Sequence, residues 1–257
     1  MKKFFLSSIC LLAFTLSYAQ DDNDDDQDTQ EVPSDFLDAF DSSREDRDVK
    51  TVTNGVFAVG WNQALGDDNG IGEDYRFWGS GIWELGLEFS TKVNKANTVR
   101  FNYGLSFQWQ TLRINDNKEF ETSGDVTRLQ PVGFNVDKSK FEQLTIIAPV
   151  HLEFGKQDKI TYDNGVTRYD DVESWTIGLG GYLGINAATN QLLKFENEGR
   201  DVTTRRYNDY EMEDFVYGLS AYVGNGALQI FAKYGLNSIF KDSPVDQQYA
   251  SIGFRFR

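Results

Sequence analysis

VRFNYGLSFQWQ, residues 99–110, alternates strictly between large apolar side chains and polar or small ones. Successive side chains of a β-strand point to opposite faces, so this stretch predicts a strand with one apolar and one polar face. WELGLEFS, residues 83–90, repeats the pattern. Weaker versions recur from about residue 50 onward, which indicates that residues 49–257 form one all-β domain.

Eight strands are expected, and consecutive strands are expected to pair. Their approximate ranges are 51–63, 76–91, 98–114, 141–155, 174–188, 213–224, 227–240 and 248–257. The prediction is therefore an eight-stranded antiparallel up-and-down transmembrane β-barrel. The segment 156–173 contains Asp163-Asn164-Gly165 and is expected to form a small hairpin beyond the membrane. If that hairpin joined the sheet, the barrel would have ten strands instead.

Two hairpins test the alternation. A turn at Asn225-Gly226, a dipeptide that favours type I′ turns, predicts the pairs Val223–Leu228, Ala221–Ile230 and Leu219–Ala232. A turn near Asn94 predicts Phe89–Val99, Leu87–Phe101 and Leu85–Tyr103, with Glu88 near Arg100. In both hairpins the apolar faces coincide. A register shifted by one residue would mix the two faces.

The composition of the polar face decides which side of the barrel is inside. A soluble barrel of the lipocalin type also alternates, but its apolar face points inward. Glycine weakens an exposed strand, whereas inside a narrow barrel it relieves crowding. Large aromatic rings on the other face would overfill such an interior, so we expect the apolar face to point outward. The polar face carries Gly86, Gly104, Gly178, Gly180, Gly184, Gly218, Gly224, Gly235 and Gly253.

The inward face then holds a set of charged side chains. Three carboxylates and three cations nearly balance, and charges inside a barrel need partners. We expect a polar network that fills the lumen, with an ion or solute path as the alternative. Eight strands leave little room for a channel. The expected lumen polar network is Glu84, Glu88, Arg100, His151, Glu153, Lys233 and Arg255.

Residues 1–19 have the pattern of a secretory signal peptide: Lys2 and Lys3, an apolar run, and a small-residue cleavage site at Ala19. Residues 20–48 are strongly acidic, and their Asp-rich start predicts a disordered periplasmic tail that could bind a protein partner. The net charge of −15 argues against nucleic acid as a partner. No later stretch is apolar for long enough to form a transmembrane helix.

The sequence gives little support for a catalytic, metal-binding or cofactor-binding site. One Cys and one His leave no His/Cys metal site, and Gly178-Leu179-Gly180-Gly181 lies within a strand rather than opening a helix. We therefore expect no metal, no cofactor and no catalytic residues. The alternative is a lipid-modifying enzyme that uses His151 with Ser106 or Ser220, although nothing in the sequence brings these residues together. The basic segment 200–206 is expected to be a solvated outer loop, with anionic lipopolysaccharide as the alternative contact.

LTIIAPVHLEF, residues 144–154, and IGFRFR, residues 252–257, resemble the mid-barrel and closing strands of the PorT-like outer-membrane β-barrel proteins of Gram-negative bacteria. The resemblance covers about residues 50–257. It implies a location in the outer membrane, contact with its lipids, and for some members a part in secretion machinery. It implies no catalytic residues. The expected function is thus a non-catalytic structural or protein-interaction role in a monomeric barrel, with narrow porin-like transport as the alternative.

Overall fold

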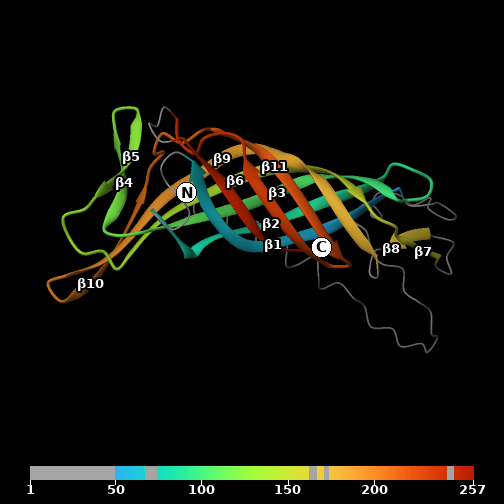
Figure 1. The fold of residues 1–257 in the computed structure, drawn as a ribbon, viewed down its shortest axis with the longest axis horizontal. Helices are drawn as coiled ribbons and strands as arrows, with labels where there is room; N and C mark the ends of the chain where they lie inside the picture. The colour runs from blue at the N-terminus through green and yellow to red at the C-terminus, as the bar shows by residue number, and fades with distance from the viewer. Residues whose placement is uncertain (1–49, 67–73, 162–166, 171–173, 242–245) are drawn as a thin grey trace, which may run out of the picture. The chain divides into compact units, whose positions relative to one another are not determined.

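The computed structural model describes residues 50–66, 74–161, 167–170, 174–241 and 246–257 (Figure 1). The expected signal peptide, 1–19, and acidic tail, 20–48, lie outside these residues. Within the described ranges, no helical segment has the length and apolar character needed to cross a membrane.

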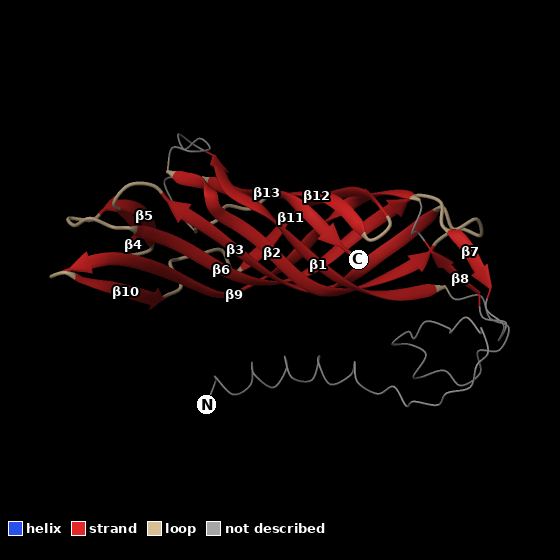
Figure 2. Cartoon of the chain, turned by 90° about the horizontal axis from the view of Figure 1, so that it is seen from below, coloured by secondary structure: helices blue, strands red, loops and turns tan. Residues whose placement is uncertain are grey.

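Eight long strands close into an antiparallel barrel. The order around it is β9-β11-β12-β13-β1-β2-β3-β6, and β6 pairs again with β9 to complete the circle. Figures 1 and 2 show these strands crossing at a steep tilt. Their bounds are β1 Thr51–Gly66, β2 Tyr75–Lys92, β3 Val99–Ile114, β6 Lys138–Phe154, β9 Trp175–Asn197, β11 Phe215–Asn225, β12 Leu228–Gly235 and β13 Gln247–Phe256. The predicted fold class and strand number are confirmed.

The remaining strands form extensions at the two ends of the barrel. At one end, β4 (Lys118–Ser123) pairs with β5 (Val126–Pro131), and β10 (Arg200–Tyr207) continues β9 as a hairpin. At the other, β7 (Asp158–Thr161) and β8 (Thr167–Asp170) form a separate two-stranded sheet. The described residues of the 156–173 connection therefore add no strand to the barrel. The stretch after residue 188, which lies between two of the expected strand ranges, is instead a continuation of β9 followed by β10.

Both predicted hairpin registers are wrong, although their faces are right. In the β11–β12 hairpin, Val223 pairs with Ile230 rather than Leu228, because Gly226 and Ala227 form the turn. Gly226 has φ +56° at the first turn position, which fits a type II′ turn instead of type I′. In the β2–β3 hairpin, Phe89 pairs with Tyr103 instead of Val99. Each register is displaced by an even number of residues, so the apolar faces still coincide.

The loop between β2 and β3 is longer than a tight turn because its own side chains stabilise it. Asn94 Oδ1 accepts hydrogen bonds from the backbone N–H groups of Thr98 at 2.9 Å and Val99 at 3.2 Å. Asn97 adopts a left-handed conformation with φ +47°, which asparagine tolerates. This loop moves Arg100 away from Glu88, which pairs with Gly104 in the sheet. The predicted proximity of Glu88 and Arg100 is therefore incorrect.

Two inward tyrosines depend on glycines in the neighbouring strand. Tyr222 pairs with Gly178, and a Cβ atom at Gly178 would lie 2.1 Å from the tyrosine ring. Tyr182 pairs with Gly218, where a Cβ would lie 2.6 Å from the tyrosine hydroxyl. No larger residue fits beside either ring without moving it. These two pairs support the interpretation that inward glycines make room in a narrow interior.

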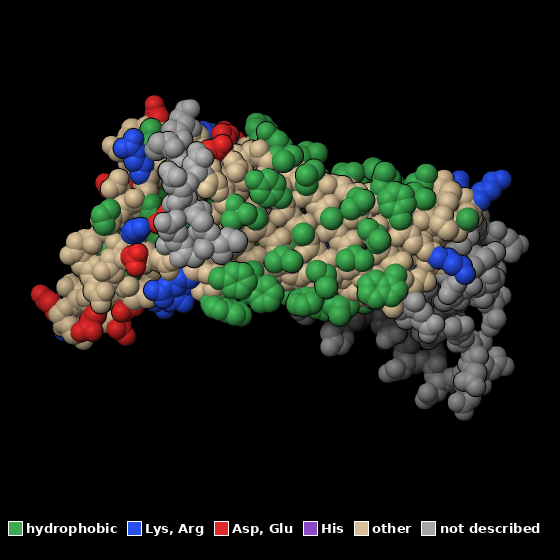
Figure 3. Space-filling view, viewed as in Figure 1, with side chains coloured by type: hydrophobic (Ala, Val, Ile, Leu, Met, Phe, Trp, Pro, Cys, Tyr) green, Lys and Arg blue, Asp and Glu red, His purple; other side chains and the backbone are tan. Residues whose placement is uncertain are grey.

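The outer surface of the barrel is a wide apolar band. Leu85 and Leu87 on β2, Leu105 on β3 and Leu183 on β9 are each more than half exposed. On β6 the apolar stretch Leu144–Phe154, at about 3.3 Å per residue and a tilt of about 40°, rises about 25 Å. Figure 3 shows hydrophobic side chains covering the middle of the barrel, while charged side chains gather at the end that carries β4, β5 and β10. The interior is correspondingly polar over the same height.

Candidate functional site in the barrel interior

Glu153 lies at the centre of the charged lumen. Arg100 is its direct cross-strand partner, and Arg100 Nε donates to Glu153 Oε1 at 2.7 Å. Arg257 Nη1 donates to Glu153 Oε2 at 2.6 Å, and the Tyr222 hydroxyl donates to the same oxygen at 2.8 Å. The Glu153 side chain is fully buried. A buried carboxylate with two cations and a hydroxyl donor is well compensated.

Glu88 forms a second cluster on β2, which β3 separates from β6 in the sheet. Arg255 Nη2 lies 2.5 Å from Glu88 Oε2, and Arg257 Nη1 lies 3.5 Å from Glu88 Oε1. Arg255 also donates to Gln229 and stacks over the Tyr222 ring, 4.4 Å from its centroid. Arg257 therefore bridges the two carboxylates. The clusters form one continuous network.

A third ion pair lies further along the lumen. Lys233 Nζ donates to Glu84 Oε2 and to Gln108 Oε1, the latter at 2.9 Å. Its ammonium group also lies 5.3 Å from the centroid of the Tyr182 ring. Both charged side chains are almost completely buried. This pair fills the part of the lumen next to the Glu153 cluster along the barrel axis.

The structure places all seven residues of the expected network inside the barrel, but with partners that differ from expectation. Arg100 contacts Glu153 rather than Glu88, because the registers differ from those predicted. Arg257 and Tyr222 were missed, although the alternation of β13 already places Arg257 on the same face as Arg255. Counting Arg257, four cations face three carboxylates.

His151 is the member of the set without a polar contact. Both of its ring nitrogens are buried and have no hydrogen-bond partner among the described residues. The ring makes an edge contact with Tyr222 at 5.1 Å. His151, Ser106 and Ser220 all line one cavity, which offers about 20 Å³ to the centre of a water molecule. That volume suits one or two waters. The serines and the histidine are near one another but not hydrogen-bonded.

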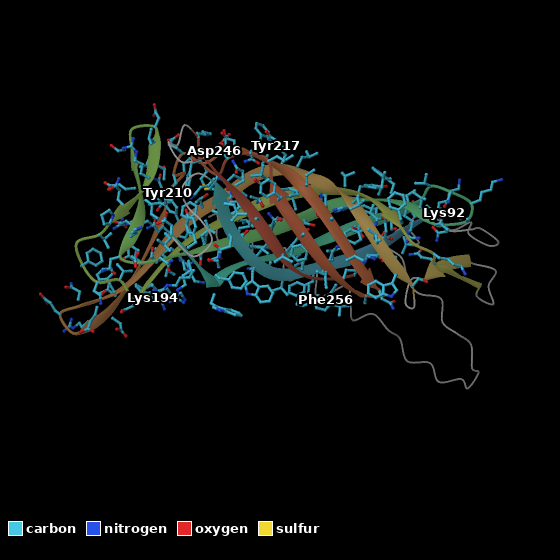
Figure 4. The ribbon with its side chains drawn as sticks, in the orientation of Figure 1. Lys92, Lys194, Tyr210, Tyr217, Asp246 and Phe256 are labelled. Atoms are coloured by element: carbon cyan, nitrogen blue, oxygen red, sulfur yellow. The ribbon has the colours of Figure 1, made fainter. Side chains whose placement is uncertain are left out.

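Above the charged network, the interior changes from polar to apolar. Phe141 packs against Phe120 of β4 with ring centroids 4.7 Å apart and against Phe240 at 5.7 Å. Tyr210 makes an edge contact with Phe141 at 5.3 Å. We call this group the outer cluster: Ala64, Tyr75, Leu112, Ile114, Phe120, Phe141, Tyr210, Met212, Ile239 and Phe240. It fills the barrel beyond the apolar band, and Figure 4 marks Tyr210 at this end, with Lys92 toward the opposite end.

Polar contacts attach the connecting segments to the outer cluster. The backbone N–H of Phe120 donates to Gln191 Oε1 at 3.1 Å, and Thr127 Oγ1 donates to the Tyr210 carbonyl at 2.7 Å. The Tyr75 hydroxyl donates to Gln247 Oε1 at 2.8 Å. Burial raises the pKa of Tyr75, and the nearby Asp74 carboxylate adds to the effect. Burial likewise raises the pKa of Tyr249, which packs against the cluster.

Metal chemistry has no site in the described part of the chain. No group of three or more His, Cys, Asp or Glu side chains is arranged to hold a metal ion there. The basic segment 200–206 is ion-paired: Arg206 contacts Glu119 at 2.8 Å and Arg205 contacts Glu142 at 3.8 Å. These contacts favour the solvated outer segment over a dedicated anion site at β10.

A closed antiparallel barrel of eight strands, apolar outside and polar inside, has the architecture of the small outer-membrane β-barrels. No family model matches the chain, and no curated protein matches it. The structure of Ail, the attachment invasion locus protein of Yersinia pestis, is 14% identical, with 80% of this chain and 99% of that chain covered and a TM-score of 0.34. A triple mutant of Rhodopseudomonas blastica porin is 11% identical over the same shares, with a TM-score of 0.19. At these values the fold assignment rests on the strand pairing itself.

Proposed function

We propose that this chain is a non-catalytic outer-membrane barrel with a structural or protein-interaction role. The observation that carries the proposal is a lumen filled at two levels, by the ion-paired network around Glu153 and by the outer cluster. An interior occupied in this way leaves the ends of the barrel as the surfaces available for function. In this proposal the apolar band lies in the outer membrane.

The proposed orientation places the outer cluster outside the cell. Outer-membrane barrels have short periplasmic turns and longer extracellular connections. The two-residue turn after β11 and the loop 93–98 lie at one end, whereas β4, β5 and β10 extend from the other. The hairpins would then present a surface to an extracellular or envelope partner. A periplasmic partner for the acidic tail, a part in secretion machinery and kinship with the PorT-like proteins remain part of the proposal.

Membrane fractionation and gel migration test the barrel and its location. The chain, expressed in a Gram-negative host, is expected in the outer-membrane fraction, and its unboiled band is expected to migrate differently from the boiled one. Recovery as a soluble protein without detergent would contradict the proposal, because the apolar band would then be exposed to water.

Narrow transport is the second candidate, since buried charges line the lumen. Planar-bilayer recordings separate the two functions. We expect no stepwise conductance, because the lumen cavities beside His151 and beside Tyr182 offer only about 20 Å³ and 10 Å³ to water centres. Reproducible channel steps from the purified chain would favour transport. A Glu84→Gln variant with altered ion selectivity would then identify the lumen as the path.

A further inference from the structure

Three cations stand in a row across neighbouring strands at the outer end of the barrel. Arg76 of β2 pairs with Arg113 of β3, which pairs in turn with Lys140 of β6. Their chain neighbours Tyr75, Leu112 and Phe141 are buried in the outer cluster, so the three cations belong to the outer face. Like charges directly opposite one another in a sheet are destabilising. An arrangement of this kind calls for a compensating anion.

The protein does not supply that anion within the part described. No carboxylate there lies within salt-bridge distance of Arg76, Arg113 or Lys140, and the contact of Arg76 is to Asn115 Oδ1 at 2.9 Å. Arg205 and Arg206, by contrast, both have glutamate partners. Burial lowers the pKa of Lys140, and the charges of Lys138 and Arg113 lower it further against the effect of Glu142.

A bulge in β2 places aromatic rings beside the row. The register shifts between Arg76 and Gly81, and Trp78 is 72% exposed within the shifted segment. Phe77 makes an edge contact with Trp78 at 5.4 Å and stacks on Trp61 at 5.8 Å. Exposed Trp and Phe rings at the edge of an apolar band are typical of a membrane interface.

Residues of the bulge also contact Arg76 and Arg113 directly. Ser80 Oγ donates to the Arg76 carbonyl at 2.6 Å and accepts the backbone N–H of Arg113 at 2.8 Å. The Arg113 side chain lies over Gly79, where a Cβ would sit 2.7 Å from Arg113 Cδ. Gly79 has φ +101°, a conformation that other residues rarely adopt. The aromatic cluster and the cation row are thus one local structure.

The row lies just beyond the apolar band. On β3 the band ends at Trp109, which stacks on Trp83 at 3.8 Å, and Arg113 lies four residues further along the strand, on the same face. Phosphate groups of lipids occupy this level of a membrane. We propose that Arg76, Arg113 and Lys140 bind the phosphate groups of lipid headgroups in the outer leaflet, with Trp78 and Phe77 anchored beside them. This inference rests on the proposed location and orientation of the barrel.

The test measures lipid binding by the refolded full chain in a neutral detergent. The lipid probes are a phosphorylated glycolipid, the same glycolipid after removal of its phosphates, and inorganic phosphate alone. Native mass spectrometry reports bound lipid. The variant R76Q/R113Q/K140Q is compared with R205Q/R206Q, which removes two cations that have glutamate partners. Heat-modifiable migration is recorded first for every protein.

The triple variant is expected to bind the phosphorylated glycolipid about 100-fold more weakly, since each basic residue at an anionic surface strengthens binding about fivefold. Dephosphorylation should weaken binding by the wild type similarly, and R205Q/R206Q should stay within about twofold of wild type. Equal binding by the triple variant would overturn the inference. Full displacement by millimolar inorganic phosphate would assign the row to a free anion and also overturn it.

The outcomes separate this inference from the proposed function. Absence of heat-modifiable migration in the wild type would show that the barrel assignment has failed, and the inference would fail with it. A heat-modifiable barrel without phosphate-dependent lipid binding would overturn the inference alone. Removing like charges relieves repulsion, so the triple variant is expected to fold. If it does not, the single variant R113Q replaces it, with an expected weakening of about fivefold, and binding equal to wild type would overturn the inference.

Discussion

The guanidinium of Arg257, the residue after β13, lies 2.6 Å from Glu153 Oε2 and so joins the end of β13 to β6 across the interior of the barrel. These two strands stand on opposite sides of the closed sheet and share no backbone hydrogen bonds. The same guanidinium reaches Glu88 of β2. One side chain thus links three strands that the backbone keeps apart, and the lumen is stabilised by contacts across it as well as around it.

Glu153→Gln is expected to destabilise the barrel by about 3–5 kcal/mol, because Arg100 and Arg257 would remain buried without their carboxylate. Urea unfolding of the refolded chain in detergent, followed by gel migration, measures the loss. Glu142→Gln is the matched control: its partner Arg205 is partly exposed at 3.8 Å, and the expected change is about 0–1 kcal/mol. Equal effects of the two variants would show that Glu153 is not the centre of the network.

Phe141→Ala is expected to loosen the outer cluster while leaving the membrane-spanning part folded. Phe141 is fully buried among Phe120, Tyr210 and Phe240, and a cavity of this kind costs about 3–5 kcal/mol. Limited proteolysis should cut the 115–137 connection faster in the variant. Phe107→Ala, on the outer face of β3, serves as the control and should not change that rate. Equal cleavage of wild type and both variants would contradict the role assigned to the cluster.

Alkaline pH is expected to open the outer cluster through Tyr75 and Tyr249. Burial raises both pKa values above the unfolded value of 10.0, so both rings stay neutral in the folded protein when they would ionise in the unfolded one. Their contribution to stability is complete below pH 10 and is lost as the pH rises from there toward the folded pKa values. Proteolysis of the 115–137 connection should accelerate above pH 10. Tyr75→Phe should reduce that acceleration, and a rate independent of pH would contradict the expectation.

His151→Gln is expected to leave the lipid composition of the host membrane unchanged. The ring nitrogens of His151 contact neither Ser106 nor Ser220, and the cavity that these residues share has room for water rather than an acyl chain. Lipid mass spectrometry of strains that express wild type, variant or neither makes the comparison. A lipid product present with wild type and absent with a folded His151→Gln protein would establish the enzyme alternative.

Alternation in the sequence was sufficient to predict the eight barrel strands and their order, and the glycines of the polar face indicated which face points inward. It did not predict β4, β5 or β10. It could not determine the registers, because a displacement by two or four residues keeps every side chain on the same face. The wrong β2–β3 register also gives Arg100 the wrong partner in the lumen. It predicts Glu88, whereas the carboxylate that Arg100 contacts is Glu153. Side-chain contacts in the 93–98 loop fixed that register, and no pattern in the strands reports on them.

The outer cluster was missed although the sequence carries a signal for it. The inward face of β3 begins with Arg100 and Asn102, continues through Gln108 and Gln110, and ends with Leu112 and Ile114. The alternation is unbroken across this change, so a search for period two alone passes over it. What changes is the polarity of the inward face. The change can be recognised only when each face of the strand is followed separately along its length.

In the proposed membrane location, that change of character means that β3 meets two solvents in turn along its length. Up to Gln110, β3 turns apolar side chains outward, as lipid requires; from Leu112 onward it turns them inward, as water requires. Pushing the barrel further into the membrane would bring charged residues such as Arg113 into hydrocarbon, and withdrawing it would expose Leu105 and Phe107 to water. The depth of insertion is therefore set by the sheet itself, and the hairpins of β4 and β10 are held at a fixed height above the lipid.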